Sequence, residues 1–182
     1  MFGLPPLPRT LDAALRDAEH PEPHVRLSAL TDLVRLTKTD ARERAILALI
    51  GLLRSDAHAE IRAEAAVGLA DAGAAGARAA LLAALDDPML RVRQLSTLAL
   101  GELGEAGDAE LGARLSASLA APEAALRFQA LIACDRLLPE QSEAMLGRAL
   151  ADADEEVRTM ALRLARKRWP AGDAPATLLA TA

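Results

Sequence analysis

The chain has 182 residues, of which 43 are Ala, 34 are Leu and only three are aromatic. Ala and Leu favour helices and strand-favouring residues are scarce, so the composition predicts an all-α fold and excludes an all-β fold. The net charge of −5 argues against binding to nucleic acid, which needs a basic surface. The single cysteine, the absence of a recognisable signal peptide and the short apolar stretches together predict a cytoplasmic protein without membrane insertion.

Ten helices in five pairs are expected, between an N-terminal extension over 1–9 and a C-terminal tail over 170–182. Thr10 and Asp40 are predicted N-caps, and Gly73, Gly104 and Gly107 lie in joints where a left-handed conformation is often needed. The first helices of the pairs are predicted over 10–19, 40–54, 75–86, 107–120 and 139–151. The second helices are predicted over 23–38, 59–72, 89–104, 123–138 and 154–169.

One short pattern recurs at the start of every second helix: an aliphatic residue, then Arg, then a small residue three positions later. The five arginines are Arg26, Arg62, Arg93, Arg127 and Arg158. Turns before the motif carry Asp56, Asp87 and Asp152, whereas the first and fourth turns carry His20 and Ala121. Because guanidinium groups match carboxylates in shape and charge, we expect each arginine to pair with a loop acid and to tie repeats together. For Arg93 the expected partner is Asp87 or a neighbouring loop acid.

The sequence from Asp86 to Arg93, Asp-Asp-Pro-Met-Leu-Arg-Val-Arg, followed by Leu100-Gly101, resembles a HEAT repeat. The similarity is to the short HEAT-like type found in bilin lyases and many bacterial proteins, and it covers about residues 10–169. It implies an armadillo-like, right-handed α-solenoid of about five HEAT-like helix pairs. It also implies an Asp–Arg ladder, which lacks its acid at His20 and Ala121. The excess of 19 Arg over 2 Lys fits a bacterial coding bias.

A row of residues on the second helices lies opposite the packing positions, two and six residues after the aliphatic residue. Its candidate protein-binding members are Leu27, Val67, Leu98, Phe128 and Ile132. The row is too apolar for a solvated face, so it is either a binding groove or part of the wide buried arc of a solenoid helix. In the first interpretation Phe128 anchors a partner helix or extended peptide. Charged residues that would rim this groove are Arg35, Asp71, Glu102 and Arg136.

These features favour a non-catalytic scaffold or adaptor that binds another protein or peptide and needs no cofactor. A bilin-lyase-like modifying enzyme or subunit is the alternative, although the chain has no Tyr and few aromatic residues for a chromophore pocket. A DNA-binding HEAT-like protein is less favoured because of the negative charge. No metal site is expected, since Pro21 and Pro23 interrupt the His20–His24 spacing. Cys134 is expected to pack as a small hydrophobic residue.

The basic end of the last predicted helix, from Arg163 to Trp169, has two interpretations. A terminal repeat needs a polar outer face, so these residues are expected to cap the array. Alternatively, they dock an acidic partner or nucleic acid.

Overall fold

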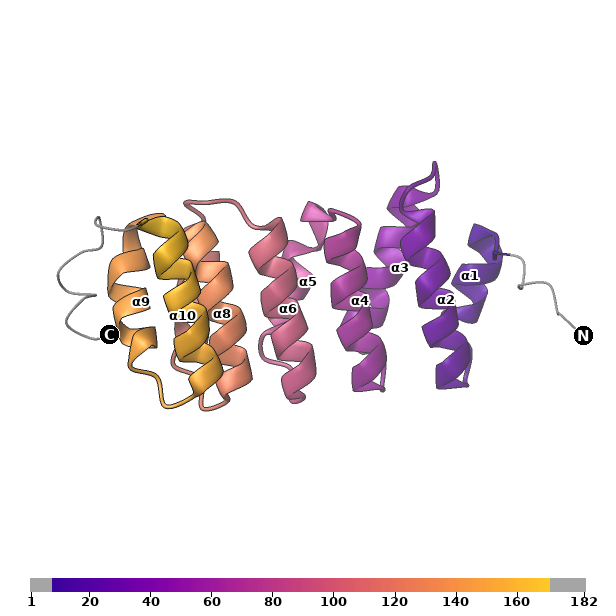
Figure 1. Ribbon diagram of the computed structural model, residues 1–182. Coiled ribbons are helices and arrows are strands. Elements are labelled where there is room, and N and C mark those ends of the chain that lie inside the picture. Colours follow the sequence, from indigo (N-terminus) through magenta and orange to yellow (C-terminus); the bar gives the residue numbers. More distant parts are fainter. Residues whose placement is uncertain (1–7, 171–182) are drawn as a thin grey trace, which may run out of the picture. The chain divides into compact units, whose positions relative to one another are not determined.

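The computed structural model describes residues 8–170, and this part of the chain is built from α-helices and two short 3₁₀-helices, with no β-strand. The chain divides into two compact units, Met1–Leu95 and Ser96–Ala182, and the division falls inside one helix, α6 (Leu90–Leu103). The helices are labelled in Figure 1. The all-α fold of paired helices predicted from the sequence is confirmed.

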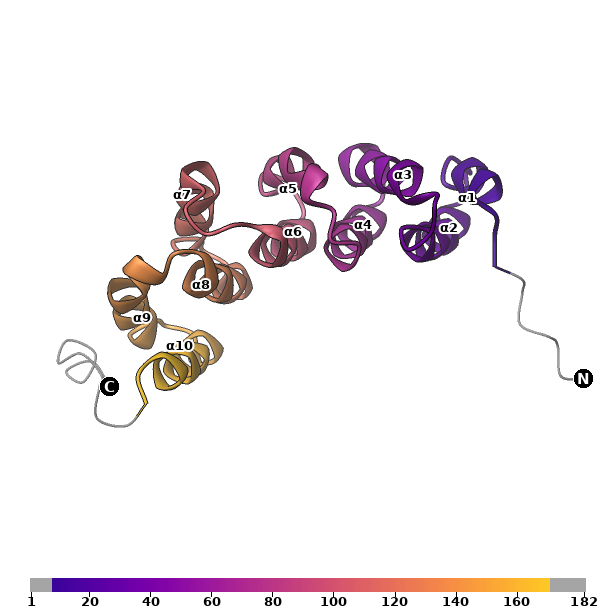
Figure 2. The same cartoon turned by 90° about the horizontal axis from the view of Figure 1, so that it is seen from above.

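The first unit contains two layers of helices (Figure 2). Its elements are α1 (Leu11–Asp17), α2 (Pro23–Leu36), α3 (Arg42–Ser55), α4 (Ala59–Asp71), η1 (Ala75–Ala77), α5 (Arg78–Ala84) and the start of α6. Helix α2 packs against α1, α3 and α4, and α3 also packs against α5. The second helices of the pairs therefore line up in one layer, and the first helices form the other.

The second unit has the same layered arrangement. It contains the rest of α6, then α7 (Ala109–Ser118), α8 (Ala124–Leu137), η2 (Pro139–Gln141), α9 (Ser142–Leu150) and α10 (Glu155–Arg168). Helix α8 packs against α7, α9 and α10, and α9 packs against α10. Helices α8 and α10 share one layer, while α7 and α9 lie behind them (Figure 2).

Helix ends agree with the predicted ends to within a few residues, with one wrong cap. Thr10 caps α1 by accepting the Ala13 N–H, as expected. Asp40 does not cap α3, which begins at Arg42 with Ala41 as its N-cap; the preceding turn is held instead by the Thr39 hydroxyl, which accepts the Ala41 N–H. Caps that the sequence analysis missed are Asp108 on α7 and Asp154 on α10.

Two of the three glycines expected in the joints have the predicted left-handed backbone. Gly73 has φ +59° and Gly107 has φ +90°, a region that side chains with a Cβ rarely adopt. Gly104 is different, because a Cβ there would lie 2.5 Å from a methyl carbon of Leu111. A glycine is needed at position 104 for close packing.

A small residue in the middle of each second helix lets neighbouring helices approach closely. This position, four residues after the aliphatic residue, is fully buried in every repeat. Its occupants are Ala29, Ala65, Ser96, Ala130 and Ala161. Ser96 is the exception in chemistry, since its Oγ is buried and has no hydrogen-bond partner among the described residues.

Ser96→Ala is therefore expected to stabilise the fold by about 1 kcal/mol, because a buried hydroxyl without a partner costs roughly that much or more. Urea unfolding of the variant and the unmodified chain measures the difference. Ser118→Ala is the matched control, because Ser118 Oγ already donates to the Arg114 carbonyl. A lower urea midpoint for Ser96→Ala would show that the hydroxyl is satisfied.

The recurring arginines form a ladder along the turns that precede the second helices. Three of them donate two parallel hydrogen bonds, from Nε and Nη2, to an aspartate of the following repeat at N–O distances of 2.6–2.9 Å. These pairs are Arg26–Asp56, Arg62–Asp87 and Arg127–Asp152. In all five arginines, Nη1 donates to the carbonyls five and six residues earlier, within the arginine's own turn.

Each ladder aspartate does two things at once. It binds the arginine of the preceding repeat, and its Oδ1 accepts the backbone N–H two residues later in its own turn. Arg93 was expected to pair with Asp87 or a neighbouring loop acid, and it does contact Asp87, although through the backbone carbonyl. Arg62 occupies that carboxylate, and Arg93 donates to the backbone carbonyls of Asp87 and Pro88.

Arg62→Ala is expected to lower the free energy of unfolding by about 2 kcal/mol, since it removes charged hydrogen bonds between partly buried groups. Urea unfolding followed by circular dichroism measures the loss. Arg54→Ala is the matched control, because Arg54 is an exposed arginine at the end of α3. Equal stability of the two variants would exclude a bracing role for Arg62.

The ladder also predicts how stability depends on pH. The Arg62 hydrogen bonds hold the pKa of Asp87 below its usual value against the opposing effect of burial, and Arg127 likewise lowers the pKa of Asp152. Carboxylates with lowered pKa values stabilise the fold above about pH 4 and lose this contribution as the pH falls through the folded-state pKa. Asp87→Asn should therefore be less stable than the unmodified chain at pH 7, and the gap should narrow below pH 4. A gap that is independent of pH contradicts this assignment.

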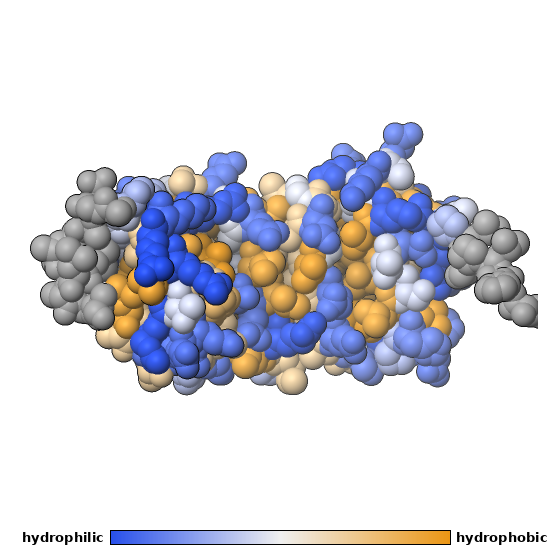
Figure 3. Space-filling view, viewed as in Figure 1, coloured by the Kyte–Doolittle hydropathy of each residue, from blue (hydrophilic) through white to orange (hydrophobic). Residues whose placement is uncertain are grey.

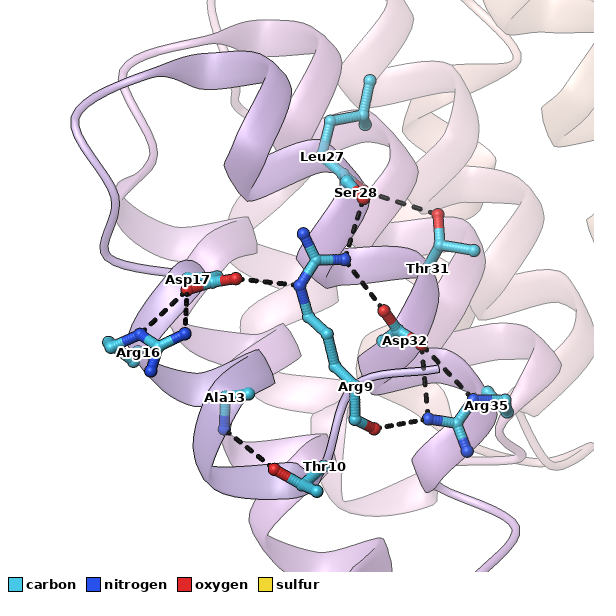
Figure 4. A network of polar contacts seen from close by, with 10 residues as sticks. All are labelled: Arg9, Thr10, Ala13, Arg16, Asp17, Leu27, Ser28, Thr31, Asp32 and Arg35. Atoms are coloured by element: carbon cyan, nitrogen blue, oxygen red, sulfur yellow. Dashed lines mark hydrogen bonds and ion pairs between the residues drawn. The ribbon is translucent and has the colours of Figure 1, made fainter. Parts of the chain in front are cut away.

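Arg9 links the start of the described chain to the first helix pair (Figure 4). Its Nε donates to Asp17 at 2.8 Å, and its Nη1 donates to Ser28 Oγ and Asp32 at 2.9 Å. Arg35 donates in turn to the Arg9 carbonyl at 2.7 Å. Arg9 thus contacts the repeats, although the sequence analysis assigned it to an extension over 1–9, of which residues 1–7 lie outside the described part.

Candidate binding surface

The five candidate binding residues lie in the layer of second helices, and none of them is fully buried. Leu27, Val67, Leu98 and Phe128 are half-buried, and the Ile132 side chain is 37% exposed. A purely structural row would be as buried as the packing row beside it. The row is therefore intermediate between buried and exposed, with Ile132 as its most exposed member.

Two of these residues line one groove in the second unit. The groove has a volume of about 610 Å³ and lies across the C-terminal half of α6, α8 and α10. Leu98 and Ile132 form its apolar floor together with Leu164, while Glu102 and Lys167 are among the charged residues at its border. On this side of the molecule, apolar surface lies between strongly hydrophilic side chains (Figure 3).

Leu164 is a groove residue that the sequence analysis missed, although a signal was present. It stands seven residues after the aliphatic residue of its repeat, where the other repeats have Asp32, Gly68, Ala99 and Ala133. A large apolar residue appears at this position only in the last repeat. The small residues Gly101 of α6 and Ala133 of α8 also line the groove.

A close approach of α6 and α8 shapes the end of the groove. A Cβ at Gly101 would lie 2.8 Å from the Ala133 Cβ, so only glycine lets the two helices come this near. Arg136 then donates from Nη1 to the carbonyls of Gly101 and Glu102, and Arg168 donates to Asp135. Arg136 was predicted as a solvated rim residue, but it also ties the end of α6 to α8.

Phe128 lies in a separate hollow and not at the centre of the groove. Its neighbours there are residues of α10, namely Glu155, Glu156, Thr159, Met160 and Arg163, around a volume of about 510 Å³. The hollow has an acidic border, whereas the groove has the cations Arg136, Lys167 and Arg168. The α8–α10 face of the second unit is therefore acidic near the N-terminus of α10 and basic near its C-terminus.

The first unit contributes its own apolar surface. Leu27 and Val67 are half-buried on α2 and α4. On the opposite layer, a groove of about 780 Å³ between α1 and α3 contains Leu47, whose side chain is 67% exposed. Arg35, a predicted rim residue, donates to Asp32 and to the Arg9 carbonyl.

The cysteine and two of the histidines, which are residue types that can serve in catalysis or metal binding, are buried or engaged in local contacts. Cys134 is buried, and burial raises the pKa of its thiol to about 12, so the thiol stays protonated. His20 Nδ1 accepts the Glu22 N–H, and His58 Nδ1 lies 3.1 Å from Arg26 Nη2. Among the described residues no cluster of His, Cys, Asp or Glu is arranged to hold a metal ion. None of the described helices combines the length and apolar character needed to cross a bilayer.

Comparison with known proteins identifies the repeat type. Residues 46–111 match the family model described as HEAT repeats. No curated protein matches the chain significantly by sequence.

Similar solved structures are repeat proteins of different origin. The crystal structure of the Escherichia coli protein YibA is 16% identical, covers 87% of this chain and 59% of its own, and gives a TM-score of 0.71. The complex of CpcE and CpcF of the phycocyanin lyase from a Nostoc species is 18% identical to this chain. The match covers 91% of this chain and 66% of the lyase chain, with a TM-score of 0.67. A designed armadillo repeat protein in complex with the peptide (KR)4 is 20% identical to this chain. The match covers 95% of this chain and 88% of the designed protein, with a TM-score of 0.64.

This chain thus spans about three fifths of the E. coli protein and 66% of the lyase chain. Sequence identities of 16–20% establish a shared fold and leave the activity and the partners of this chain open. Residues 46–111 thus match HEAT repeats, and the chain as a whole shares the fold of paired, stacked helices with these repeat proteins.

Proposed function

We propose that this chain is a non-catalytic scaffold that binds a segment of a partner protein in the groove over α6, α8 and α10. The observation that carries the proposal is the groove itself, with its floor of Leu98, Ile132 and Leu164 and its charged border. Apolar side chains left at the surface between charges are how soluble proteins commonly mark an interaction site. Burying them against a partner provides affinity, and the charges restrict orientation.

The size of the groove suits a peptide segment or one face of a helix. About 610 Å³ is comparable to pockets that enclose a few side chains. The helices around it are held by Arg136 and Arg168, so the binding surface is largely preformed and little order is lost on binding. The designed armadillo protein, with a TM-score of 0.64, supports this reading because its structure contains a bound peptide.

The charges of the groove favour a partner different from the basic peptide of that designed protein. Three cations, Arg136, Lys167 and Arg168, line the groove against two carboxylates, Glu102 and Asp135, and Asp135 is already bound by Arg168. Lys167 therefore suits a carboxylate of the partner, while the Ile132 floor suits an aliphatic or aromatic side chain. The groove is expected to prefer an apolar segment that carries acidic residues.

Ile132→Ser together with Leu164→Ser is expected to remove partner binding while lowering the melting temperature only slightly, because both side chains are partly exposed. The measurement compares proteins captured from the native host by the unmodified chain and by the double variant, identified by mass spectrometry. Leu47→Ser is the matched control, since it removes an exposed leucine outside the groove. Val92→Ser, in the core, shows the melting-temperature loss of a structural residue.

The proposal requires at least one protein that the unmodified chain and Leu47→Ser capture and that the groove variant loses. If the groove variant captures the same proteins in the same amounts, the groove is not the binding surface. If it melts as early as Val92→Ser, Ile132 and Leu164 are core residues and the proposal fails.

A further inference from the structure

No described residue covers the end face of the last repeat, and within the described part of the chain Arg158 lacks the carboxylate that Arg26, Arg62 and Arg127 bind. Arg158 makes the usual Nη1 bonds to its own turn, to the carbonyls of Asp152 and Ala153 at 2.7 and 2.9 Å. In Arg26, Arg62 and Arg127 the remaining edge, Nε and Nη2, binds an aspartate of the next repeat. Among the described residues this edge of Arg158 has no partner.

The exposure of Leu162 on the same helix, α10, also indicates an uncovered surface on the last described repeat. Leu162, five residues after the aliphatic residue of its repeat, is 38% exposed. The residues at this position in the four preceding repeats are at most 5% exposed, and they are Leu30, Ala66, Thr97 and Leu131. This position is therefore buried wherever another repeat follows, and the last repeat leaves a leucine uncovered beside an arginine that is held in its ladder geometry.

We propose that this end face, formed by Arg158 and Leu162, docks a helical repeat of another chain whose interhelical turn begins with an aspartate. The aspartate would accept two parallel hydrogen bonds from Nε and Nη2 of Arg158, as Asp152 does from Arg127. An apolar side chain of the docked repeat would cover Leu162. This surface is separate from the groove over α8 and α10, so the inference stands or fails independently of the proposed function.

The first turn of this chain shows why the partner is not a second copy. His20 occupies the ladder position there, and its Nδ1 accepts the Glu22 N–H at 3.1 Å, as Asp87 Oδ1 accepts the Met89 N–H. The Arg26 bonds to the His20 and Pro21 carbonyls are also the usual ones. His20 thus reproduces the geometry of the turn without offering a carboxylate, and head-to-tail stacking of identical chains would place an imidazole against Arg158.

The same feature supplies a defined probe. A chain carrying His20→Asp and Arg158→Ala presents the missing carboxylate on a turn of ladder geometry and has no end-face arginine with which to bind itself. Mixed with the unmodified chain, this probe is expected to form a one-to-one complex in sedimentation velocity. The affinity should fall about tenfold or more when the probe carries His20→Asn in place of His20→Asp, or when the receiving chain carries Arg158→Ala.

Melting curves verify that every variant is folded before mixing. Binding that does not change with Arg158→Ala, or the absence of a complex, would overturn the proposal. Asp173 is the single acidic residue in the sequence after Glu156, so the receiving chain is also tested as Asp173→Asn. A complex that forms only with that variant would assign Arg158 to the chain's own Asp173 and would likewise overturn the docking of a partner.

Discussion

The hydrogen-bonded pair between an arginine of one repeat and an aspartate of the next is the contact that fixes the stacking at three junctions between the described repeats. Helix pairs of this length bury too little apolar surface to be stable alone, so each pair needs a neighbour at a fixed position. The guanidinium group provides that position because it binds its own turn and the next turn at once. The aspartate does the same from the other side, since it also closes its own turn.

The same interaction differs between the first and the last described repeat. Inside the units, ladder pairs and small packing residues hold the second helices in one layer, and this layer carries the apolar groove near α10. At the two ends the ladder differs: His20 closes the first turn without a carboxylate, and Arg158 has the geometry to receive one. The ladder therefore accounts for an asymmetry between the first and the last described repeat.

Much of the fold could be predicted from the sequence because the same local pattern recurs in every repeat. The aliphatic–Arg pattern places each second helix, and the aspartates before it place each turn, so helix ends were predicted to within a few residues. Asp40 was mispredicted as a cap because Thr39 nearby stabilises the turn as well. For Arg93 the sequence left open whether Asp87 or a neighbouring loop acid is the partner, since spacing along the chain does not say which of two arginines reaches a carboxylate. Arg62 binds the Asp87 carboxylate, and Arg93 donates to the Asp87 carbonyl.

The groove over α6, α8 and α10 was only partly predictable, for a physical reason. Helical periodicity places Leu98 and Ile132 on the right face, but the depth of a groove depends on how closely two helices approach. Gly101 against Ala133 sets that approach, and Leu164 completes the floor from a helix 30 residues further along. Phe128, the expected anchor, is not among the residues that line the groove and lines a separate hollow with residues of α10.

A double-mutant cycle on Arg62 and Asp87 tests the central role of the ladder most directly. Urea unfolding of Arg62→Ala, Asp87→Ala and the double variant isolates the coupling between the two side chains from their other contacts. If the pair holds adjacent repeats together, the coupling free energy should be about 1–3 kcal/mol at neutral pH. A coupling within about 0.3 kcal/mol of zero would mean that the two residues act independently, and the stacking would then have to be attributed to the apolar contacts alone.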